Sequence, residues 1–317
     1  MIDRRSFAAL FAGLLANGAW ADGKPVHWIV PYATGGSADV LARLVSQYIA
    51  ARWNVPVLVE ARPGGGTVIG NSIVAKAAPD GNTILFISNS FTINAKLRSD
   101  LPYDGMRAFV PVANMVNSPQ VVACNVDKPY RTFKDLIADA KARPGAVSIG
   151  TLGPATTQHI AAEMLQRTTG VKMIYTPFTG GAPAVTAALG GHIDVVLANL
   201  SEEIAQIQGG RLRPLAVTTR ERLEQLKDVP TVEELGYTGY EAVAWFGVAA
   251  PAGTPPDVVN RLSEAIRAAM ADAEILKKLE PLGLQPAFMD PKAFSAFIAE
   301  QYAKYSRVID EAGIKTE

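Results

Sequence analysis

The sequence has few of the residues that carry enzymatic or nucleic-acid chemistry. Its 317 residues include one cysteine, so no disulfide can form within the chain. The three histidines, His27, His159 and His192, show no metal-ligand spacing. Lysine plus arginine equals aspartate plus glutamate, 30 against 30. This balance argues against a nucleic-acid or membrane-surface binder, since both need a basic field. Cys124 stands in an apolar run and is expected to pack as a small buried hydrophobe.

The motifs of common enzyme classes are also missing. There is no G-x-x-x-x-G-K-[ST] phosphate loop and no G-x-S-x-G turn, and Ser37 and Ser201 have no adjacent base. The stretch 64–70 comes close to a dinucleotide fingerprint but spaces its last glycine one residue too far. We expect Glu202 and Glu203 to form an exposed acidic pair rather than an acid/base pair. The sequence therefore predicts no catalytic residue, no metal, no cofactor and no enzymatic activity.

No apolar run is long enough to span a membrane, but the start of the chain has the pattern of an export signal. Basic residues at Arg4 and Arg5, a short apolar run over 8–15 and a small-x-small site at 19–21 predict a signal peptide over residues 1–21, cleaved after about Ala21. The arginine pair also resembles a twin-arginine signal, so both export routes stay open. We expect a mature protein that is soluble in a bacterial periplasm, with no direct membrane insertion.

The rest of the chain alternates short apolar runs with amphipathic stretches. Strands are expected over 26–30, 55–59 and 83–88, with helices that begin at Ser37 and near 64–70 between them. A second series has strands over 147–151, 172–175, 193–197 and 212–217 and helices that begin at 156 and 181. Strands that alternate with helices predict mostly parallel sheets with helices on both faces. Two further helices, from 255 and around 294–309, close the chain.

Two crossings join these series. Strand-like runs over 110–116 and 120–126 flank the first crossing, and the apolar run 243–248 is typical of a return strand. We predict two α/β lobes, residues 22–118 with 246–317 and residues 119–245, joined by a two-crossing hinge. Ligands of open α/β sheets bind at the carboxyl ends of the strands, so a ligand cleft is expected between the lobes.

Turns rich in Gly, Ser and Thr follow four of the expected strands. They are Thr34–Ser37, Ser88–Ser90, Gly150–Thr157 and Thr179–Ala182. Glycine lets a ligand approach the backbone closely, and the first turn of a helix leaves N–H groups unpaired at the positive end of its dipole. Such turns hold anions without a fixed positive charge. The sequence predicts a two-sided clamp for a small organic anion, although each turn alone could be an ordinary capped loop.

Two residues beside these turns have two interpretations each. If Gly36 caps its helix, Asp39 can bond back to the cap N–H, or it can contact a ligand cation or water. His159 stands in the corresponding place after Thr156, where it can serve in capping and packing or in contact with the ligand.

The chain resembles a known family at these turns and in several other segments. It is similar to the substrate-binding receptors of tripartite tricarboxylate transporters, the Bug or TctC receptors. The matching segments run in family order over essentially the whole mature chain: Pro31–Asp39 with Ala42 and Arg43, Glu60–Gly66, Pro79–Gly81, Leu101–Asp104, Gly190–Asp194, Leu215–Thr218, Val229–Gly236 and Ala250–Pro255.

The resemblance implies a type II-like, two-lobed periplasmic binding protein that closes on its ligand. It implies delivery of that ligand to a two-component membrane permease, and ligands that are organic acids held by backbone amides, hydroxyls and ordered waters. A monomer is expected. A receptor that docks on a sensor kinase, and an exported hydrolase, stay open as alternatives.

The second lobe departs from the family pattern. Phe178 and Thr179 stand where the family often has Tyr followed by Lys or Arg, and Ala198 with Asn199 stands where an acid often follows the strand. A ligand with an amino group thereby loses a partner, so we expect a mono- or dicarboxylate whose apolar or aromatic body packs on Phe178, Trp245 and Phe246. The remaining candidate ligand residues are Tyr32, Thr34, Gly35, Gly36, Ser37, Asp39, Ser88, Asn89, Ser90, Thr151, Thr156, Thr157, His159, Thr179, Gly180, Gly181, Ala182 and Asn199.

Overall fold

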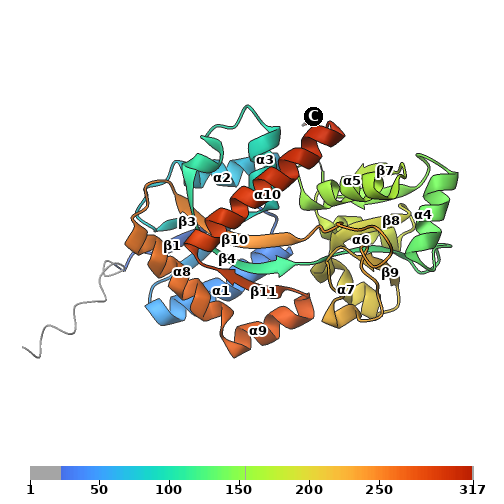
Figure 1. The fold of residues 1–317 in the computed structure, drawn as a ribbon. Coiled ribbons are helices and arrows are strands. Elements are labelled where there is room, and N and C mark those ends of the chain that lie inside the picture. Colours follow the sequence, from blue (N-terminus) through green and yellow to red (C-terminus); the bar gives the residue numbers. More distant parts are fainter. Residues whose placement is uncertain (1–22, 154, 316–317) are drawn as a thin grey trace, which may run out of the picture.

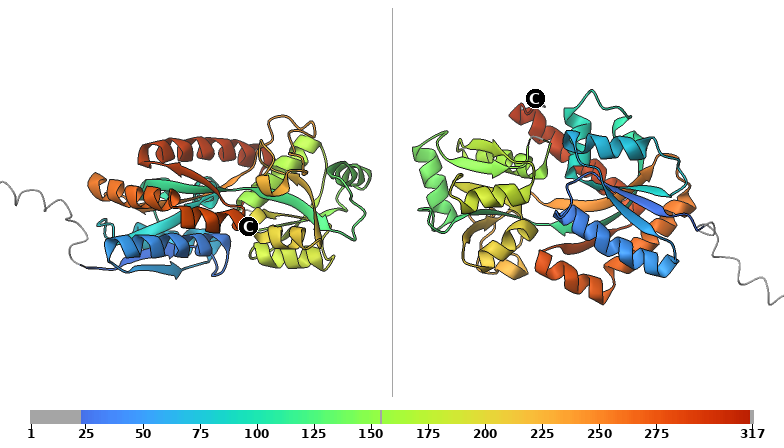
Figure 2. Two further views of the ribbon diagram at one scale, coloured as in Figure 1. Left: turned by 90° about the horizontal axis from the view of Figure 1, so that it is seen from below. Right: turned by 180° about the vertical axis from the view of Figure 1, so that it is seen from behind.

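The structure, a computed structural model, describes residues 23–153 and 155–315. The expected signal peptide over 1–21 and its cleavage site lie outside these residues. Within them, no helix combines the length and the apolar character needed to cross a membrane. The described chain forms two α/β lobes, each built on its own sheet, which lie side by side in Figures 1 and 2.

The first sheet has six strands in the order β11-β4-β10-β3-β1-β2. Its strands are β1 (Val26–Val30), β2 (Val57–Ala61), β3 (Thr83–Ser88), β4 (Phe109–Ser118), β10 (Ala244–Pro251) and β11 (Gln285–Met289). β1 pairs in parallel with β2 and β3, whereas β10 runs antiparallel between β3 and β4. Strands from both ends of the chain therefore share one sheet.

Six helices cover the two faces of the first sheet (Figure 1). They are α1 (Ser37–Trp53), α2 (Val68–Ala75), α3 (Asn89–Leu97), α8 (Pro256–Met270), α9 (Ala273–Leu279) and α10 (Pro291–Ala312). Apolar side chains of α1, α8 and α9 pack on one face around Trp28 and Phe86. Those of α2, α3 and α10 pack on the other face around Leu85 and Trp245.

The second sheet has five strands in the order β7-β6-β8-β5-β9. Its elements are β5 (Gln120–Asn125), α4 (Phe133–Ala142), β6 (Ser148–Thr151), α5 (Thr157–Thr169), β7 (Ile174–Pro177), α6 (Gly181–Leu189), β8 (Val195–Asn199), α7 (Leu200–Gln208) and β9 (Leu212–Val217). Helices α4 and α5 cover one face, and α6 and α7 cover the other. In both sheets, the strand that arrives from the other lobe pairs antiparallel with its neighbours.

Two crossings connect the sheets. β4 ends at Ser118 and β5 begins at Gln120, so one residue separates the first pair of strands. On the return, β10 begins at Ala244, and Trp245 already pairs with Asn117 in the first sheet. We propose that the lobes divide at these crossings, with Ala244 and Trp245 in the first lobe rather than in the second.

Thr218 joins the two crossings to each other. Its backbone N–H donates to the Gln120 carbonyl at 3.1 Å, and its hydroxyl lies 2.6 Å from the Ala242 carbonyl oxygen. Thr218 has no exposed surface, so these bonds form in a dry environment, where an unpaired carbonyl would be costly. The two crossings are therefore held as one unit.

Candidate ligand cleft

The first half of the cleft is the turn that leads from β1 into α1. Gly36 caps α1 without offering a side chain, and Gly35 has a φ of 83°, which favours glycine. Asp39 is 2% exposed and accepts from the Gly35 N–H and from Arg43 Nε, both at 3.0 Å. Burial acts to raise the pKa of Asp39, but the bonds from Arg43 and Gly35 outweigh it and hold that pKa below its usual value. Asp39 thus bonds back to Gly35, the residue before the cap Gly36, rather than to the cap itself.

Tyr32 connects this turn to the end of β3. Its hydroxyl lies 2.5 Å from Ser88 Oγ, and its ring packs edge-on against Phe86 at 6.1 Å. Ser88 caps α3 by accepting from the Ser90 N–H at 3.4 Å. Burial raises the pKa of Tyr32, so the phenol stays neutral. The two turns of the first lobe therefore form one continuous hydroxyl-lined edge.

The β6–α5 turn begins the second half of the cleft. Thr156 caps α5 by accepting from the His159 N–H at 3.3 Å. The His159 ring packs on Tyr175, with ring centroids 4.5 Å apart, and its Nδ1 lies 3.5 Å from Thr151 Oγ1. Burial lowers the pKa of His159, so its imidazole is neutral at neutral pH. His159 is used for capping and packing within this lobe.

Phe178 and the exposed turn that follows it lie at the next strand end. A Cβ added at Gly150 would lie 3.3 Å from the Phe178 ring, so the ring rests directly on the β6 backbone. Thr179 and Ala182 are exposed at the rim, and Gly180 caps α6 with no side-chain bond. The start of α6 therefore leaves its first N–H groups without a side-chain cap.

The acidic pair Glu202 and Glu203, on the first turn of α7, is more buried than expected. The expectation of an exposed pair is wrong, because Glu203 has no exposed surface and Glu202 is half-buried. Glu202 Oε2 accepts from the Asn199 N–H at 3.1 Å, and Asn199 Oδ1 accepts from Gln158 at 3.2 Å. The sequence could have indicated the Asn199–Glu202 bond, since these two residues have the spacing of a helix N-cap and its N3 acid.

The two halves of the candidate site meet where the lobes touch. Ser37 Oγ, on the first turn of α1, lies 2.7 Å from Ser201 Oγ, on the first turn of α7. A Cβ added at Gly66 of the first lobe would lie 3.7 Å from Ala155 of the second. Helix α10 also reaches the second lobe, where Ile309 joins an apolar cluster with Ile160 of α5 (Figure 2). One predicted turn of each lobe therefore lies at a contact between the lobes: Thr34–Ser37 beside Ser201, and Gly150–Thr157 beside Gly66.

Three candidate residues lie in the core of the first lobe instead of in the cleft. Trp245 is 1% exposed and packs edge-on against Phe294 at 5.4 Å, whereas Phe246 is 6% exposed and packs against Phe86. Asn89 has no exposed surface. Its amide bonds to the Val243 carbonyl at 3.2 Å, to the Tyr305 hydroxyl at 2.6 Å and to the Trp245 N–H at 2.9 Å. Core packing and hinge bonds occupy these three side chains, so we do not include them among the residues proposed to contact a ligand.

Within residues 23–153 and 155–315, no three His, Cys, Asp or Glu side chains gather in a way that could hold a metal ion. Ser37 has the Ser201 hydroxyl as its partner instead of a base. The candidate site between the lobes therefore offers helix N-termini, hydroxyls and one aromatic ring. These groups can hold a small anion by hydrogen bonds.

Comparison with known proteins identifies the family. The sequence profile of the Tripartite tricarboxylate transporter family receptor, TctC, matches residues 41–314. The chain belongs to the TctC family. BugT of Bordetella pertussis is 33% identical over 294 residues, which cover 92% of this chain and 90% of BugT.

Solved TctC-like structures share the fold. A Rhodopseudomonas palustris protein with adipate superposes with a TM-score of 0.87 at 29% identity, over 92% of this chain and 98% of that protein. MatC from the same organism, with bound malate, has a TM-score of 0.82 at 25% identity, over 90% of this chain and 99% of MatC. The two-lobed periplasmic binding protein fold expected from the resemblance is confirmed.

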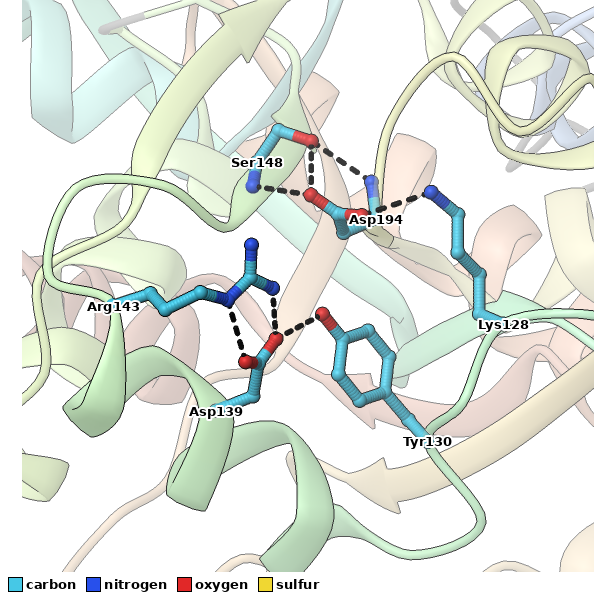
Figure 3. A network of polar contacts seen from close by, with 6 residues as sticks. All are labelled: Lys128, Tyr130, Asp139, Arg143, Ser148 and Asp194. Carbon is cyan, nitrogen blue, oxygen red and sulfur yellow. Dashed lines mark hydrogen bonds and ion pairs between the residues drawn. The ribbon is translucent and has the colours of Figure 1, made fainter.

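One segment that resembles the TctC family lies at the amino end of β6 and β8, away from the turns. Asp194 accepts from the N–H and the hydroxyl of Ser148, both at 2.9 Å, and from Lys128 Nζ at 2.8 Å (Figure 3). Beside it, Asp139 is bonded by Arg143 and by the Tyr130 hydroxyl. These contacts tie β6 to β8, so the acid of the Gly190–Asp194 segment holds the sheet together.

Proposed function

We propose that this protein is a periplasmic solute receptor that closes on a small organic carboxylate and delivers it to a two-component permease of the tripartite tricarboxylate type. The observation that carries the proposal is that two glycine-capped helices, α1 of the first lobe and α6 of the second, both begin beside the first turn of α7. Ser37 of α1 lies 2.7 Å from Ser201, and the carboxyl group of Glu202 rests on Gly181 of α6. The first turns of α1 and α6 carry N–H groups without a side-chain cap at the positive ends of the helix dipoles. A small anion such as a carboxylate is a ligand that such a pair of helix ends can hold.

The solved relatives support this choice of ligand class. Adipate and malate, bound by the two Rhodopseudomonas palustris proteins, are both dicarboxylates. The hydroxyls of Tyr32 and Ser88 and the ring of Phe178 give this cleft a polar edge and one apolar surface. We therefore propose a mono- or dicarboxylate with an apolar body against Phe178.

The residues proposed to contact the ligand come from both lobes. They are Tyr32, Thr34, Gly35, Gly36, Ser37, Ser88, Ser90, Thr151, Thr156, Thr157, Phe178, Thr179, Gly180, Gly181, Ala182 and Asn199. Asp39 and His159 act as positioning residues, because Asp39 bonds to the Gly35 N–H and the His159 ring contacts Thr151 and Tyr175 behind the turns that bear these groups. A receptor role is favoured over hydrolysis because the Ser37 hydroxyl faces another hydroxyl.

The experiment is a thermal-shift and calorimetric screen of the mature protein with mono- and dicarboxylates, adipate and malate included, beside their uncharged amides. A ligand that binds only the folded state at 100 times its Kd adds about 2.7 kcal/mol of stability. We expect stabilisation by at least one carboxylate and by none of the amides. The absence of any shift across the panel would contradict the proposal.

Matched variants place the ligand in the cleft. A Cβ at Gly36 or Gly180 would meet no neighbour closer than 3.6 or 3.8 Å, so Gly36→Val and Gly180→Val should fold. Their side chains would cover the helix ends, and we expect at least about tenfold weaker binding, equivalent to the ~1.4 kcal/mol of one good hydrogen bond. Ala51→Val, on the exposed far end of α1, is the control and should bind normally.

A further inference from the structure

Glu202 places a carboxylate at the point where the second lobe is proposed to receive the ligand. Its neighbour Ser201 meets Ser37 of the first lobe at 2.7 Å. A Cβ added at Gly181 would lie 2.0 Å from the Glu202 carboxyl carbon, so the carboxyl group rests directly on the first residue of α6. Its Oε2 also accepts from the Asn199 N–H at 3.1 Å. Glu202 therefore lies at the N-terminal ends of α6 and α7 together.

No cation is paired with this carboxylate among the described residues. The segments 181–189 of α6 and 195–199 of β8 contain no titratable side chain. Across the cleft, Arg43 of α1 is engaged by Asp39 at 2.9 Å. On α7 itself the adjacent charge is Glu203, which is fully buried and whose oxygens have no hydrogen-bond partner of normal geometry.

Among the described residues, the remaining elements packed near α7 place no cation in contact with Glu202. Arg213 of β9 donates to the Tyr130 carbonyl, and Cys124 of β5 is a buried thiol. The 3₁₀ turn Glu280–Leu282 contributes another acid. Helix α5 contributes His159, which burial keeps neutral, and Glu163, which is bonded by the Tyr175 hydroxyl. Burial raises the pKa of Glu202 to about 7 in this setting.

A ligand carboxylate held by the start of α6 would lie beside Glu202. Two carboxylates in contact cannot both stay ionised at little cost, and a shared proton relieves their repulsion. We propose that Glu202 takes up a proton when a carboxylate ligand binds and donates a hydrogen bond to it, which makes ligand capture proton-linked. This inference rests on the proposed function, since it requires an anionic ligand in the cleft.

The inference also changes what the second lobe selects. The sequence had indicated that this edge lacks a carboxylate, because Ala198 and Asn199 replace an acid. Glu202 supplies one from the helix that follows. A ligand amino group at this position would pair with ionised Glu202 and release protons on binding, whereas a carboxylate takes them up. The sign of the proton exchange therefore distinguishes the two ligand classes.

The test is isothermal titration calorimetry of the mature protein with adipate, with malate and with the tightest carboxylate of the screen. Each titration is repeated in buffers of different ionisation enthalpy, between about pH 6 and about pH 9. We expect net uptake approaching one proton above about pH 7, with a Kd that rises up to about tenfold per pH unit there and is flat below. Glu202→Gln should bind without proton uptake and without this pH dependence.

Controls separate the possible outcomes. Glutamine can still accept the cap bond from Asn199, so Glu202→Gln is expected to fold. Glu300→Gln on the exposed face of α10 should behave like the unmodified protein. Proton uptake that persists in Glu202→Gln, proton release, or binding without proton exchange would overturn the inference while leaving the receptor function intact. If no carboxylate binds, the proposed function fails and the inference fails with it.

A second measurement follows the protonation of Glu202 in the unmodified protein, so it does not require Glu202→Gln to bind a ligand. The carboxyl ¹³C resonance of Glu202, assigned by its absence in Glu202→Gln, should titrate near neutrality in the free protein. Saturating carboxylate should move its midpoint upward, because the ligand charge penalises the ionised form. A midpoint that stays in place when ligand binds would also overturn the inference.

Discussion

Glu203 is a fully buried carboxyl group whose pKa is strongly raised. Burial, and secondly the charge of Glu202, raise its pKa well above the usual value, and an interaction with the Ala198 backbone does not offset them. The folded protein then holds Glu203 neutral, whereas the unfolded chain ionises it above about pH 4.5. Its contribution to stability is therefore best at low pH and worsens as pH rises.

We expect Glu203→Gln to stabilise the protein, by about 1–3 kcal/mol near pH 8 and by less near pH 5, because the amide has no charge to lose. Urea unfolding at the two pH values measures the difference. A gain in unfolding free energy that is the same at both pH values would show that Glu203 is ionised in the folded protein. A loss of unfolding free energy that grows with pH would show the same.

Asn89 is the residue that joins α3, the return crossing and α10. Its three side-chain bonds reach Val243, Trp245 and Tyr305 from a fully buried position. Asn89→Ala leaves these partners unpaired, and we expect a loss of about 2–4 kcal/mol in urea unfolding. Asn260→Ala, on the exposed face of α8, should change stability by less than about 0.5 kcal/mol. Equal effects of the two variants would contradict this role.

The sequence predicted helix caps well where the signal was local. Gly36, Thr156 and Gly180 cap their helices as the Gly, Ser and Thr turns indicated. It did not predict the burial of Trp245 and Glu203, because an apolar or acidic residue beside a strand end gives the same sequence pattern whether it faces solvent or the core. Burial of these side chains is decided by which helix packs over them, and that is not a local property.

At the scale of elements, Asp194 links β6 to β8 through its hydrogen bonds with Ser148 and its ion pair with Lys128 (Figure 3). Burial acts to raise the pKa of Asp194, but bonds from Lys128 and Ser148 outweigh it and lower that pKa. A lowered carboxyl pKa contributes stability that is present above the ordinary value of about 3.8 and is lost as pH falls through the folded-state pKa.

We therefore expect Asp194→Asn to cost about 1–3 kcal/mol near pH 7, with the difference shrinking toward pH 3. Thermal unfolding across this range measures it. Asp127→Asn, an exposed acid in the same loop as Lys128, is the matched control and should be neutral. A cost that does not depend on pH would assign the role of Asp194 to shape rather than to charge.

Helices and strands lie where the sequence predicts them when the apolar run and the capping residues indicate the same boundary. The strand expected over 55–59 lies instead at Val57–Ala61, since Pro56 has no N–H to donate and pairing with β1 starts at Val57. Helix α4 was missed although Thr132 and Asp135 form a capping box. The short α9 and the edge strand β11 carry too few periodic residues to be recognised before the fold places them.

At the scale of the whole molecule, the sequence indicated two lobes and a hinge but not how the lobes meet. The structure has the lobes in contact through Ser37 and Ser201, through Gly66 and Ala155, and through α10 on α5. These contacts join residues distant in sequence, and no periodicity predicts them. Under the proposed function, the lobes must separate at such contacts to admit a ligand.

Cysteines at Ser37 and Ser201 should trap this arrangement. The hydroxyl oxygens are 2.7 Å apart, which is compatible with a bond of about 2.05 Å between the replacing sulfurs after a small shift. The native Cys124 is fully buried in β5, and burial raises its pKa, so it should not compete for oxidation. We expect Ser37→Cys with Ser201→Cys to form a disulfide on mild oxidation, seen as a shift in non-reducing electrophoresis.

Oxidised without ligand, this double variant should bind the carboxylate at least about tenfold more slowly than its reduced form, because entry requires the lobes to separate. Oxidised with ligand, it should retain the carboxylate through dialysis until a reductant is added. The pair Ser37→Ala and Ser201→Ala controls for loss of the hydroxyls and should respond to neither treatment. Entry at the same rate in both redox states would mean that the ligand reaches its site without opening this contact.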